Sequence, residues 1–279
     1  MKRRSVRFSP SVLHLSAKVF LSNILGQGFE RETSFLKYVI GPANICLHVG
    51  ASDGRHSFVM SRLAHQGTIY AFEPAEFGFA VLCNVVAMHG LRNLRQFNVA
   101  VSDVEEDISL VTPVKVNGRL GRSYAMIDKD PAGPIRRDDI RSIGVRHQPA
   151  HAVALDGFCA AQHLDRVDFI RCDVEGAEGK VLAGGRAMIE RDRPNMLIEI
   201  HPGALRTGFD SSAENVRDWL LTRGYRMFQV RENRLIASEQ ITQGPWDDYF
   251  FIHPSRAAAL PAGPFRSAME TPSGGADGA

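Results

Sequence analysis

The sequence lacks the features that mark several large classes of protein. It has four cysteines in 279 residues (Cys46, Cys83, Cys159 and Cys172), and none belongs to a C-x-x-C pair. This usage argues against a disulfide framework or a zinc site and predicts small buried side chains in a reducing compartment. No apolar run approaches the roughly twenty residues that a membrane-spanning helix needs. The net charge of +2 argues against a nucleic-acid-binding protein that relies on bulk electrostatic attraction.

The first residues lack a complete secretion signal. Basic residues at positions 2–4 resemble the start of one, but His14, Ser16 and Lys18 interrupt the stretch that should be apolar. We therefore expect no cleaved signal and predict a cytoplasmic protein.

The patterning divides the chain into a main domain and three appendages. Hydrophobic residues make up 44% of the sequence, which is enough for one sizeable core. We predict a helical extension over residues 1–43, a main domain over 44–253, and an inserted loop over 112–150 within it. The Ala, Pro, Gly and Ser content of residues 254–279 predicts a disordered tail.

Within the extension, residues 11–25 carry apolar side chains at helical spacing. The spacing favours a helix packed on the core or on a partner subunit. With arginines ahead of it, the alternative is an interfacial helix in weak peripheral contact with a membrane. The sequence does not indicate the oligomeric state.

The main domain begins with a strand, a glycine turn and a helix. Residues 44–49 form a short apolar run, Gly50 and Gly54 break it, and a helical pattern follows through Leu63. A second apolar run over 69–72 ends at Glu73. In doubly wound folds such a carboxylate accepts hydrogen bonds from the hydroxyls of a ribose. The two segments together predict an adenosine-containing cofactor.

The spacing of the glycines favours one cofactor over another. A dinucleotide fingerprint reads G-x-G-x-x-G, whereas here Ala51 and Ser52 stand where the second glycine would be expected. S-adenosylmethionine carries no pyrophosphate and needs only a close turn and an acid for its ribose. The loop therefore favours S-adenosylmethionine. The alternatives are a nicotinamide-dependent oxidoreductase and a tight turn that binds nothing.

Later segments complete an α/β sheet. Residues 94–101 alternate like a third strand, and Asn98, Val99 and Ala100 at its end are expected beside an adenine base. Residues 107–111 resemble a short extra strand, and residues 214–223 a helix. Strands over 225–230 and 248–253 follow with no long crossover helix between them, which predicts an antiparallel hairpin at the sheet edge. A dinucleotide-dependent dehydrogenase would not end in this way.

The inserted loop over 112–150 is broken by glycines and prolines and is rich in arginine. Its arginines are Arg119, Arg122, Arg136, Arg137, Arg141 and Arg146. A long basic loop of this kind is typical of a lid over an anionic or polyhydroxyl substrate. A solvated variable loop is the alternative.

Two further strand ends carry the residue types needed for chemistry. Asp173, Glu175 and Glu178 follow the strand over 167–172, and His201 follows the strand over 195–200. Ligands of open α/β sheets lie at the carboxyl ends of the strands. Acids this close together raise one another's pKa or require a cation such as a sulfonium, an ammonium group, a proton or a metal ion. Part of the pattern is also typical of a helix start, where acids suit the helix dipole.

The same segments resemble the FkbM-type S-adenosylmethionine-dependent methyltransferases. The resemblance rests on residues 49–54 (VGASDG), 71–74 (AFEP), 99–103 (VAVSD) and 167–178 (VDFIRCDVEGAE). It implies a class I methyltransferase fold: a Rossmann-like α/β three-layer sandwich with a mostly parallel sheet and an antiparallel last strand. It also implies methyl transfer, usually to oxygen, on small molecules or sugars.

Two positions depart from the family pattern. His48 stands where the family usually has Asp, a residue that helps to place the methionine part of the cofactor. Ser52 and Asp53 replace a common Asn-x pair, and Asp53 or Asp173 is expected to take over the missing role. The predicted cofactor site comprises His48, Gly50, Ala51, Ser52, Asp53, Gly54, Glu73, Pro74, Asn98, Val99, Ala100 and Asp173.

A hydroxyl acceptor needs a base to take its proton. Asp173, Glu175 and His201 are the predicted catalytic residues, and the predicted acceptor is a hydroxyl of a sugar, a glycan or another small natural product. A divalent metal held by the same three residues is the alternative. It is less favoured because the spacing of these residues does not match a metal-binding motif. A non-catalytic relative that binds cofactor or a partner is a further alternative, because of His48.

Overall fold

The computed structural model describes residues 8–115, 126–127, 142–208, 211–242 and 244–270. Its centre is an eight-stranded sheet with the order β11-β10-β12-β9-β8-β1-β2-β3. Strands β3, β2, β1, β8 and β9 run parallel, and β12 is antiparallel to both of its neighbours. The strands are β1 (Ile45–Val49), β2 (Thr68–Phe72), β3 (Leu94–Phe97), β8 (Phe169–Cys172), β9 (Asn195–Ile200), β10 (Arg226–Arg231), β11 (Arg234–Ala237) and β12 (Asp247–Ile252).

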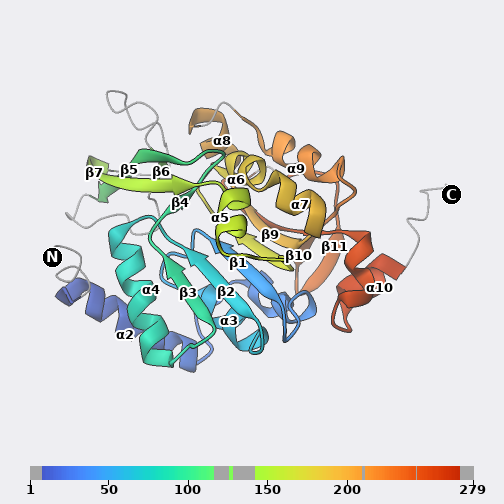
Figure 1. Ribbon diagram of the computed structural model, residues 1–279, viewed down its shortest axis with the longest axis horizontal. Helices are drawn as coiled ribbons and strands as arrows, with labels where there is room; N and C mark the ends of the chain where they lie inside the picture. The colour runs from blue at the N-terminus through green and yellow to red at the C-terminus, as the bar shows by residue number, and fades with distance from the viewer. Residues whose placement is uncertain (1–7, 116–125, 128–141, 209–210, 243, 271–279) are drawn as a thin grey trace.

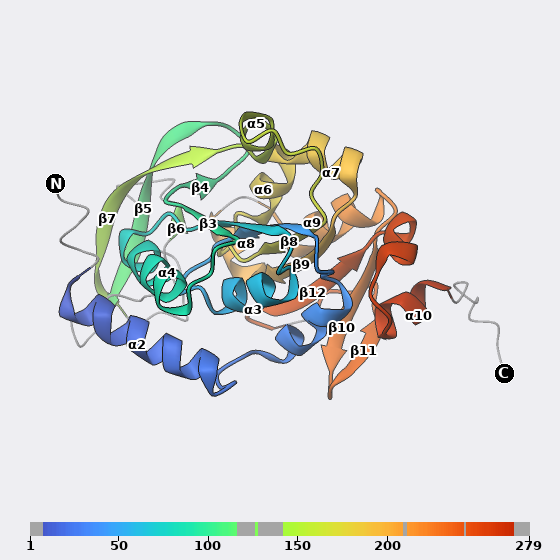
Figure 2. The same cartoon turned by 60° about the horizontal axis from the view of Figure 1, so that its bottom comes forward.

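Helices cover both faces of this sheet (Figures 1 and 2). Helices η1 (Arg31–Tyr38), α3 (Arg55–Leu63), α4 (Glu76–His89) and α10 (Pro264–Glu270) contribute to the core on one face. Helices α5 (Leu155–Ala161), α6 (Glu178–Gly184), α7 (Arg186–Asp192) and α9 (Ala213–Leu221) contribute to the core on the other. The central strands read as continuous apolar runs because they are buried on both faces. The predicted three-layer α/β fold is confirmed.

The parallel strands end at one edge of the sheet, and this edge positions the site. Four strands end there, and the residues that follow them at once are Gly50 after β1, Glu73 after β2, Asp173 after β8 and His201 after β9. In an open α/β sheet ligands bind in the crevice beyond these ends.

The third strand is shorter than predicted. It ends at Phe97, and Ala100 already belongs to β4 (Ala100–Val101), which pairs with β7 in a second sheet. Asn98 and Val99 connect the two sheets. The alternation over 94–101 predicts one strand because a two-residue connection between sheets does not change the polarity pattern.

The second sheet has the order β4-β7-β5-β6. Its long strands are β5 (Glu106–Lys115) and β7 (Ser142–Val153), and β6 spans Met126–Ile127. The predicted loop over 112–150 is therefore strand in part, and the predicted strand over 107–111 lies in the first half of β5. The antiparallel pairing of β5 with β7 satisfies the backbone hydrogen-bonding groups of both strands, so these strands form without a regular apolar pattern that would predict them. Of the loop's six arginines, Arg146 lies exposed on β7, and the other five lie outside the described residues.

The N-terminal extension folds as predicted into a helix, α2 (Pro10–Ile24). One side of α2 packs Val12 and Val19 against Val81 and Val85 of α4. The other side exposes Leu13, Leu21 and Ile24. The exposed side suits a partner subunit as well as a membrane surface, so both interpretations stay predictions. None of the helices in the described part of the chain has the length and apolarity needed to cross a bilayer.

The C-terminal segment differs from the predicted disordered tail. Residues 254–270 form η2 (Pro254–Ala259) and α10, and Phe265 is fully buried against Phe35, Phe228 and Phe250. The packing of this one aromatic side chain in the core orders an Ala/Pro-rich segment whose average composition suggests disorder. Residues 271–279 lie outside the described residues.

The closing strands also differ in one respect. β10 and β12 form the predicted antiparallel pair. The sheet edge, however, is β11, which pairs with β10, while β12 lies between β10 and β9. The short, mostly exposed β11 lacks the apolar run that predicts the other strands.

Candidate active site

A cavity of about 400 Å³ lies at the carboxyl edge of the parallel strands. Its walls come from residues 28–30, from the turns after β1 and β2, from β4, and from the ends of β8 and β9. Most of the predicted site residues line it: His48, Gly50, Ala51, Ser52, Asp53, Glu73, Pro74, Val99, Ala100, Asp173, Glu175 and His201. Gly54 and Asn98 do not appear in this wall.

The glycine turn brings β1 close to β8. Gly50 has φ +79°, and a Cβ at this position would collide with the backbone carbonyl oxygen of Asp173. Gly54, with φ +84°, stands at the N-cap of α3, where it lies against Leu82. Gly50 therefore shapes the cavity floor, whereas Gly54 starts the helix behind it.

Glu73 holds the same turn from the side of β2. Its Oε2 accepts a hydrogen bond from the backbone N–H of Ser52 (2.7 Å), and its Oε1 accepts one from Ala75 (2.8 Å). The carboxyl is buried, and burial raises its pKa to about 7. Each carboxylate oxygen keeps a second lone pair, so the group fits a ribose hydroxyl that donates to it.

Asn98 stabilises the backbone of the turn that carries this carboxylate. Its Nδ2 donates to the backbone oxygens of Glu73 (2.9 Å) and Pro74 (3.0 Å). The structure thus places Asn98 as a brace for the turn that carries Glu73, next to the cavity-lining Val99 and Ala100.

His48 is buried and hydrogen-bonded. Its Nδ1 lies 2.6 Å from the hydroxyl oxygen of Ser57. Burial, together with the charge of Arg171, lowers its pKa to about 3, so the ring is neutral. Asp53, one of the two residues expected to compensate for His48, forms an ion pair with Arg55 (3.0 Å). Asp173, the other of the two, lies 3.6 Å from the guanidinium of Arg171.

A buried arginine organises the acids at this edge. Arg171 of β8 is fully buried, and its guanidinium lies 3.0 Å from Glu199, 3.0 Å from Asp248 and 3.6 Å from Asp173. No motif in the sequence assigns a role to Arg171, Glu199 or Asp248. An arginine within the apolar strand FIRC is the signal that could have found them, because a buried guanidinium needs carboxylate partners.

His201 is held by two acids. Its Nε2 lies 2.7 Å from Glu199 Oε1 and 3.7 Å from Glu175 Oε2. Burial lowers its pKa, but the hydrogen bond to Glu199 and the charge of Glu175 oppose burial, and the pKa of His201 is raised. Glu175 has φ +56°, a left-handed conformation that costs a non-glycine residue about 1 kcal/mol. This backbone conformation places Glu175 in the cavity wall.

Asp173 completes the cluster. Its side chain is 30% exposed, and burial raises its pKa well above the usual value, with Arg171 opposing and Glu199 and Glu175 adding to the shift. Ligand atoms of Asp173, Glu175 and His201 all lie within 4.8 Å of one another. The three predicted catalytic residues therefore converge on one point of the cavity wall, where they can hold a proton or a cation.

Glu178 lies outside this wall, although it belongs to the same acidic block. It is fully buried, and its Oε1 accepts the N–H of Gly176 (3.0 Å). Burial raises its pKa to about 7. The cavity also includes Glu30, His56 and Trp246, which no motif in the sequence indicated.

The chain matches the family described as "Methyltransferase FkbM domain" over residues 48–227. It is 27% identical over 192 residues to the 2-O-methyltransferase NoeI of Sinorhizobium fredii (strain NBRC 101917 / NGR234), an alignment that covers 60% of this chain and 70% of NoeI.

Solved structures of methyltransferases are similar to it as well. The methyltransferase FkbM of Methylobacillus flagellatus KT is 14% identical with a TM-score of 0.48, over 77% of this chain and 44% of that one. A SAM-dependent methyltransferase of Aquifex aeolicus is 14% identical with a TM-score of 0.43, over 88% and 99%.

The family match spans well over half of the chain and contains the glycine turn, Glu73 and the Asp173–His201 cluster. It also decides against the nicotinamide-dependent oxidoreductase. The protein belongs to the FkbM family of S-adenosylmethionine-dependent methyltransferases.

Proposed function

We propose that the protein transfers a methyl group to a hydroxyl oxygen of a sugar, a glycan or another small natural product. The observation that carries the proposal is the convergence of Asp173, Glu175 and His201 on one wall of the cavity. The name of NoeI, a 2-O-methyltransferase, supports oxygen as the acceptor atom.

S-adenosylmethionine, when bound, supplies a methyl group on a sulfonium, which needs no further activation. The residues of the chain then have to orient two molecules and exclude water. The turn of residues 50–53 and the Glu73 carboxylate are proposed to hold the cofactor. The floor beside Gly50 gives close access because no side chain stands there.

Asp173 is the proposed general base. It is the cluster's most exposed carboxylate, and its raised pKa makes it a stronger proton acceptor than an ordinary aspartate. His201 and Glu199 are hydrogen-bonded to each other, which fixes the imidazole ring beside Asp173. The charge of Glu175, 3.7 Å from His201, favours the protonated form of the ring.

The acids also suit the charge of the ligand. Asp173, Glu175 and Glu199 outnumber the positive groups of Arg171 and His201 at this wall. A sulfonium carries one positive charge, so an excess of carboxylates favours its binding. The same excess supports the alternative of a divalent metal held by Asp173, Glu175 and His201, which would lower the pKa of the acceptor hydroxyl.

The test is a methyl-transfer assay with isotopically labelled S-adenosylmethionine and a panel of sugars, oligosaccharides and polyhydroxylated natural products. With an accepted substrate, Asp173→Asn and His201→Ala should each lower kcat by about a hundredfold or more, the usual contribution of a general base. Glu105→Gln, on an exposed carboxylate beside His151, is the matched control and should keep full activity.

Full turnover by both variants would overturn the assignment of the base. Addition of a chelator separates the two versions of the mechanism. The metal-free version predicts unchanged rates after the chelator is removed by dialysis.

A second function, cofactor binding without catalysis, is favoured by one observation. His48 points its Nδ1 at Ser57 and is neutral, so it does not supply the carboxylate that the family usually has at this place. Binding of S-adenosylhomocysteine with no turnover on any acceptor would support that function instead.

A further inference from the structure

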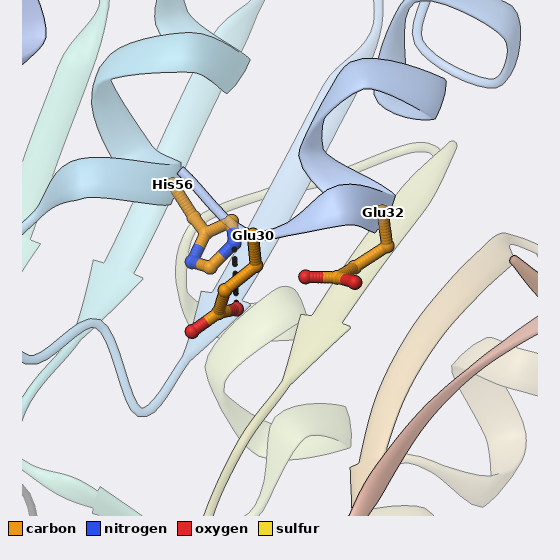
Figure 3. A group of neighbouring side chains, drawn as sticks. All are labelled: Glu30, Glu32 and His56. Carbon is orange, nitrogen blue, oxygen red and sulfur yellow. Dashed lines mark ion pairs between the residues drawn. The ribbon is translucent and has the colours of Figure 1, made fainter. Parts of the chain in front are cut away.

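A second cluster of ligand-type side chains lies beside the cavity (Figure 3). Glu30 is the N-cap residue of η1, Glu32 lies in its first turn, and His56 is the second residue of α3. Glu30 and His56 also line the cavity. None of the three takes part in the proposed methyl transfer.

The three side chains face one another. His56 Nε2 lies 3.4 Å from Glu30 Oε2, and one ligand atom from each residue lies within 4.8 Å of the others. Figure 3 shows the Glu32 carboxylate directed toward Glu30 and the His56 ring. Atoms that bind one ion at about 2.0–2.2 Å are at most about 4.4 Å apart, so small side-chain shifts would place all three around an ion.

Glu32 supplies independent support for a ligand. It is 6% exposed, and its Oε1 has no hydrogen-bond partner among the described residues. An unsatisfied buried oxygen costs about 1–3 kcal/mol, and more for a charged group. Burial raises the pKa of Glu32 to about 7, and the neighbouring Glu30 adds to the shift. A proton or a cation at this oxygen would remove that cost.

His56 is in the form that binds metals. Its side chain is 16% exposed, and burial, with the charge of Arg171, lowers its pKa well below the usual value. A neutral imidazole has a free nitrogen lone pair for a metal. The Thr33 hydroxyl oxygen, 3.1 Å from the same Nε2, is a further oxygen next to this point.

Glu199 and Asp248, the acids beside this cluster, form ion pairs with Arg171, whereas the charge of Arg171 acts on Glu30 and Glu32 only from beyond ion-pair distance. Ligand atoms of Glu30 also lie within 4.8 Å of those of Glu199 and Asp248, but both of these acids pair with Arg171. In the part of the chain that the structure describes, Glu30 and Glu32 form no ion pair with an arginine or a lysine.

We propose that Glu30, Glu32 and His56 form a site for a first-row divalent metal ion of the Mn²⁺ or Zn²⁺ class. Two carboxylate oxygens and one imidazole nitrogen are the ligands that such ions accept. Two negative charges balance the ion. The Glu30 side chain is 45% exposed, so the ion keeps open positions toward the cavity for water or for an oxygen of a bound molecule.

The site can be tested by metal binding alone, without cofactor or acceptor, so its failure is distinct from a failure of the proposed methyl transfer. The full chain is freed of metal with a chelator and titrated with MnCl₂, with free Mn²⁺ measured by electron paramagnetic resonance. Calorimetry with ZnCl₂ gives the second titration. We expect one tightly bound ion per chain and a higher Tm in its presence.

The variants locate the ion. Glu32→Gln keeps the shape of the side chain and removes its charge, so it should weaken binding at least tenfold without lowering the Tm of the metal-free protein. His56→Asn should weaken binding similarly. Asp173→Asn tests the other three-residue cluster and should keep the wild-type affinity, as should the surface control Glu105→Gln.

Three results would overturn the proposal. These are no binding at millimolar metal, wild-type affinity in both Glu32→Gln and His56→Asn, and loss of binding in Asp173→Asn but not in Glu32→Gln. The last result would place the ion at Asp173, Glu175 and His201 instead.

Discussion

Replacement of Arg171 by methionine is the perturbation that most directly probes how the acidic edge is stabilised. The guanidinium is the shared positive partner of Asp173, Glu199 and Asp248, and it is fully buried. Methionine fills a similar volume but leaves these carboxylates without their counter-charge. Removal of one partner from a buried ion pair typically costs about 3–5 kcal/mol. For a chain of this size that corresponds to a fall in Tm of about 6 to 20 °C.

The loss of thermal stability in Arg171→Met should depend on pH in a defined direction. In the wild type, burial raises the pKa of Glu199, but the hydrogen bond to His201 and the charge of Arg171 bring it below its ordinary value. Its stabilising contribution is therefore present at neutral pH and is lost as the pH falls through that lowered pKa. Without Arg171 the pKa of all three carboxyls rises, and they become protonated at mildly acidic pH. The difference in Tm between wild type and Arg171→Met should be widest near pH 8 and should narrow toward pH 5.

Thermal unfolding followed by circular dichroism across this pH range is the assay. Arg186→Met is the matched control, because Arg186 forms an exposed pair with Glu190 (3.0 Å), and exposed ion pairs contribute little to stability. A difference in Tm that stays constant between pH 5 and pH 8, or that is no larger than the control's, would refute the reasoning.

Two further substitutions test the fold around the site. Gly50→Ala should destabilise the protein by at least about 2 kcal/mol in urea unfolding, because its Cβ would meet the carbonyl oxygen of Asp173 in a left-handed conformation. Gly90→Ala, which has a similar φ of +63° but open space around it, should cost only about 1 kcal/mol. Equal losses would show that the close approach at Gly50 is unimportant. Phe265→Ala should cost about 3–5 kcal/mol and make residues after 253 sensitive to limited proteolysis. An unchanged Tm with an unchanged digestion pattern would contradict the docking of α10.

The sequence predicts the central sheet and most of the cavity wall well, for a physical reason. Buried parallel strands need continuous apolar runs, and the residues that follow them must break that pattern. Gly50, Glu73, Asp173 and His201 each follow such a run, so their positions at one edge follow from topology alone. Gly54 and Asn98 belong to the same turns but do not line the cavity. Gly54 lies against Leu82, and Asn98 is hydrogen-bonded to the backbone of residues 73–74. These contacts between distant residues cannot be predicted from the local sequence.

The remaining features depend on contacts between distant parts of the chain. Glu30 and His56 are polar residues in ordinary sequence surroundings, and only the contact of η1 with α3 brings them together. Asp248 becomes a partner of Arg171 because β12 enters the sheet beside β9. The β5–β7 ladder and the docking of Phe265 likewise arise from pairing and burial that no local pattern encodes.

Calorimetric titration with S-adenosylhomocysteine tests most directly whether the cofactor binds in this cavity through Glu73. We predict micromolar binding by the wild type, no binding of NADH, and an affinity lowered roughly tenfold to a hundredfold in Glu73→Gln, the worth of a hydrogen bond to a charged acceptor. Because burial raises the pKa of Glu73 to about 7, wild-type affinity should increase from pH 6 to pH 8, whereas the variant's should not. Wild-type affinity in Glu73→Gln, or binding of NADH in place of S-adenosylhomocysteine, would contradict the account.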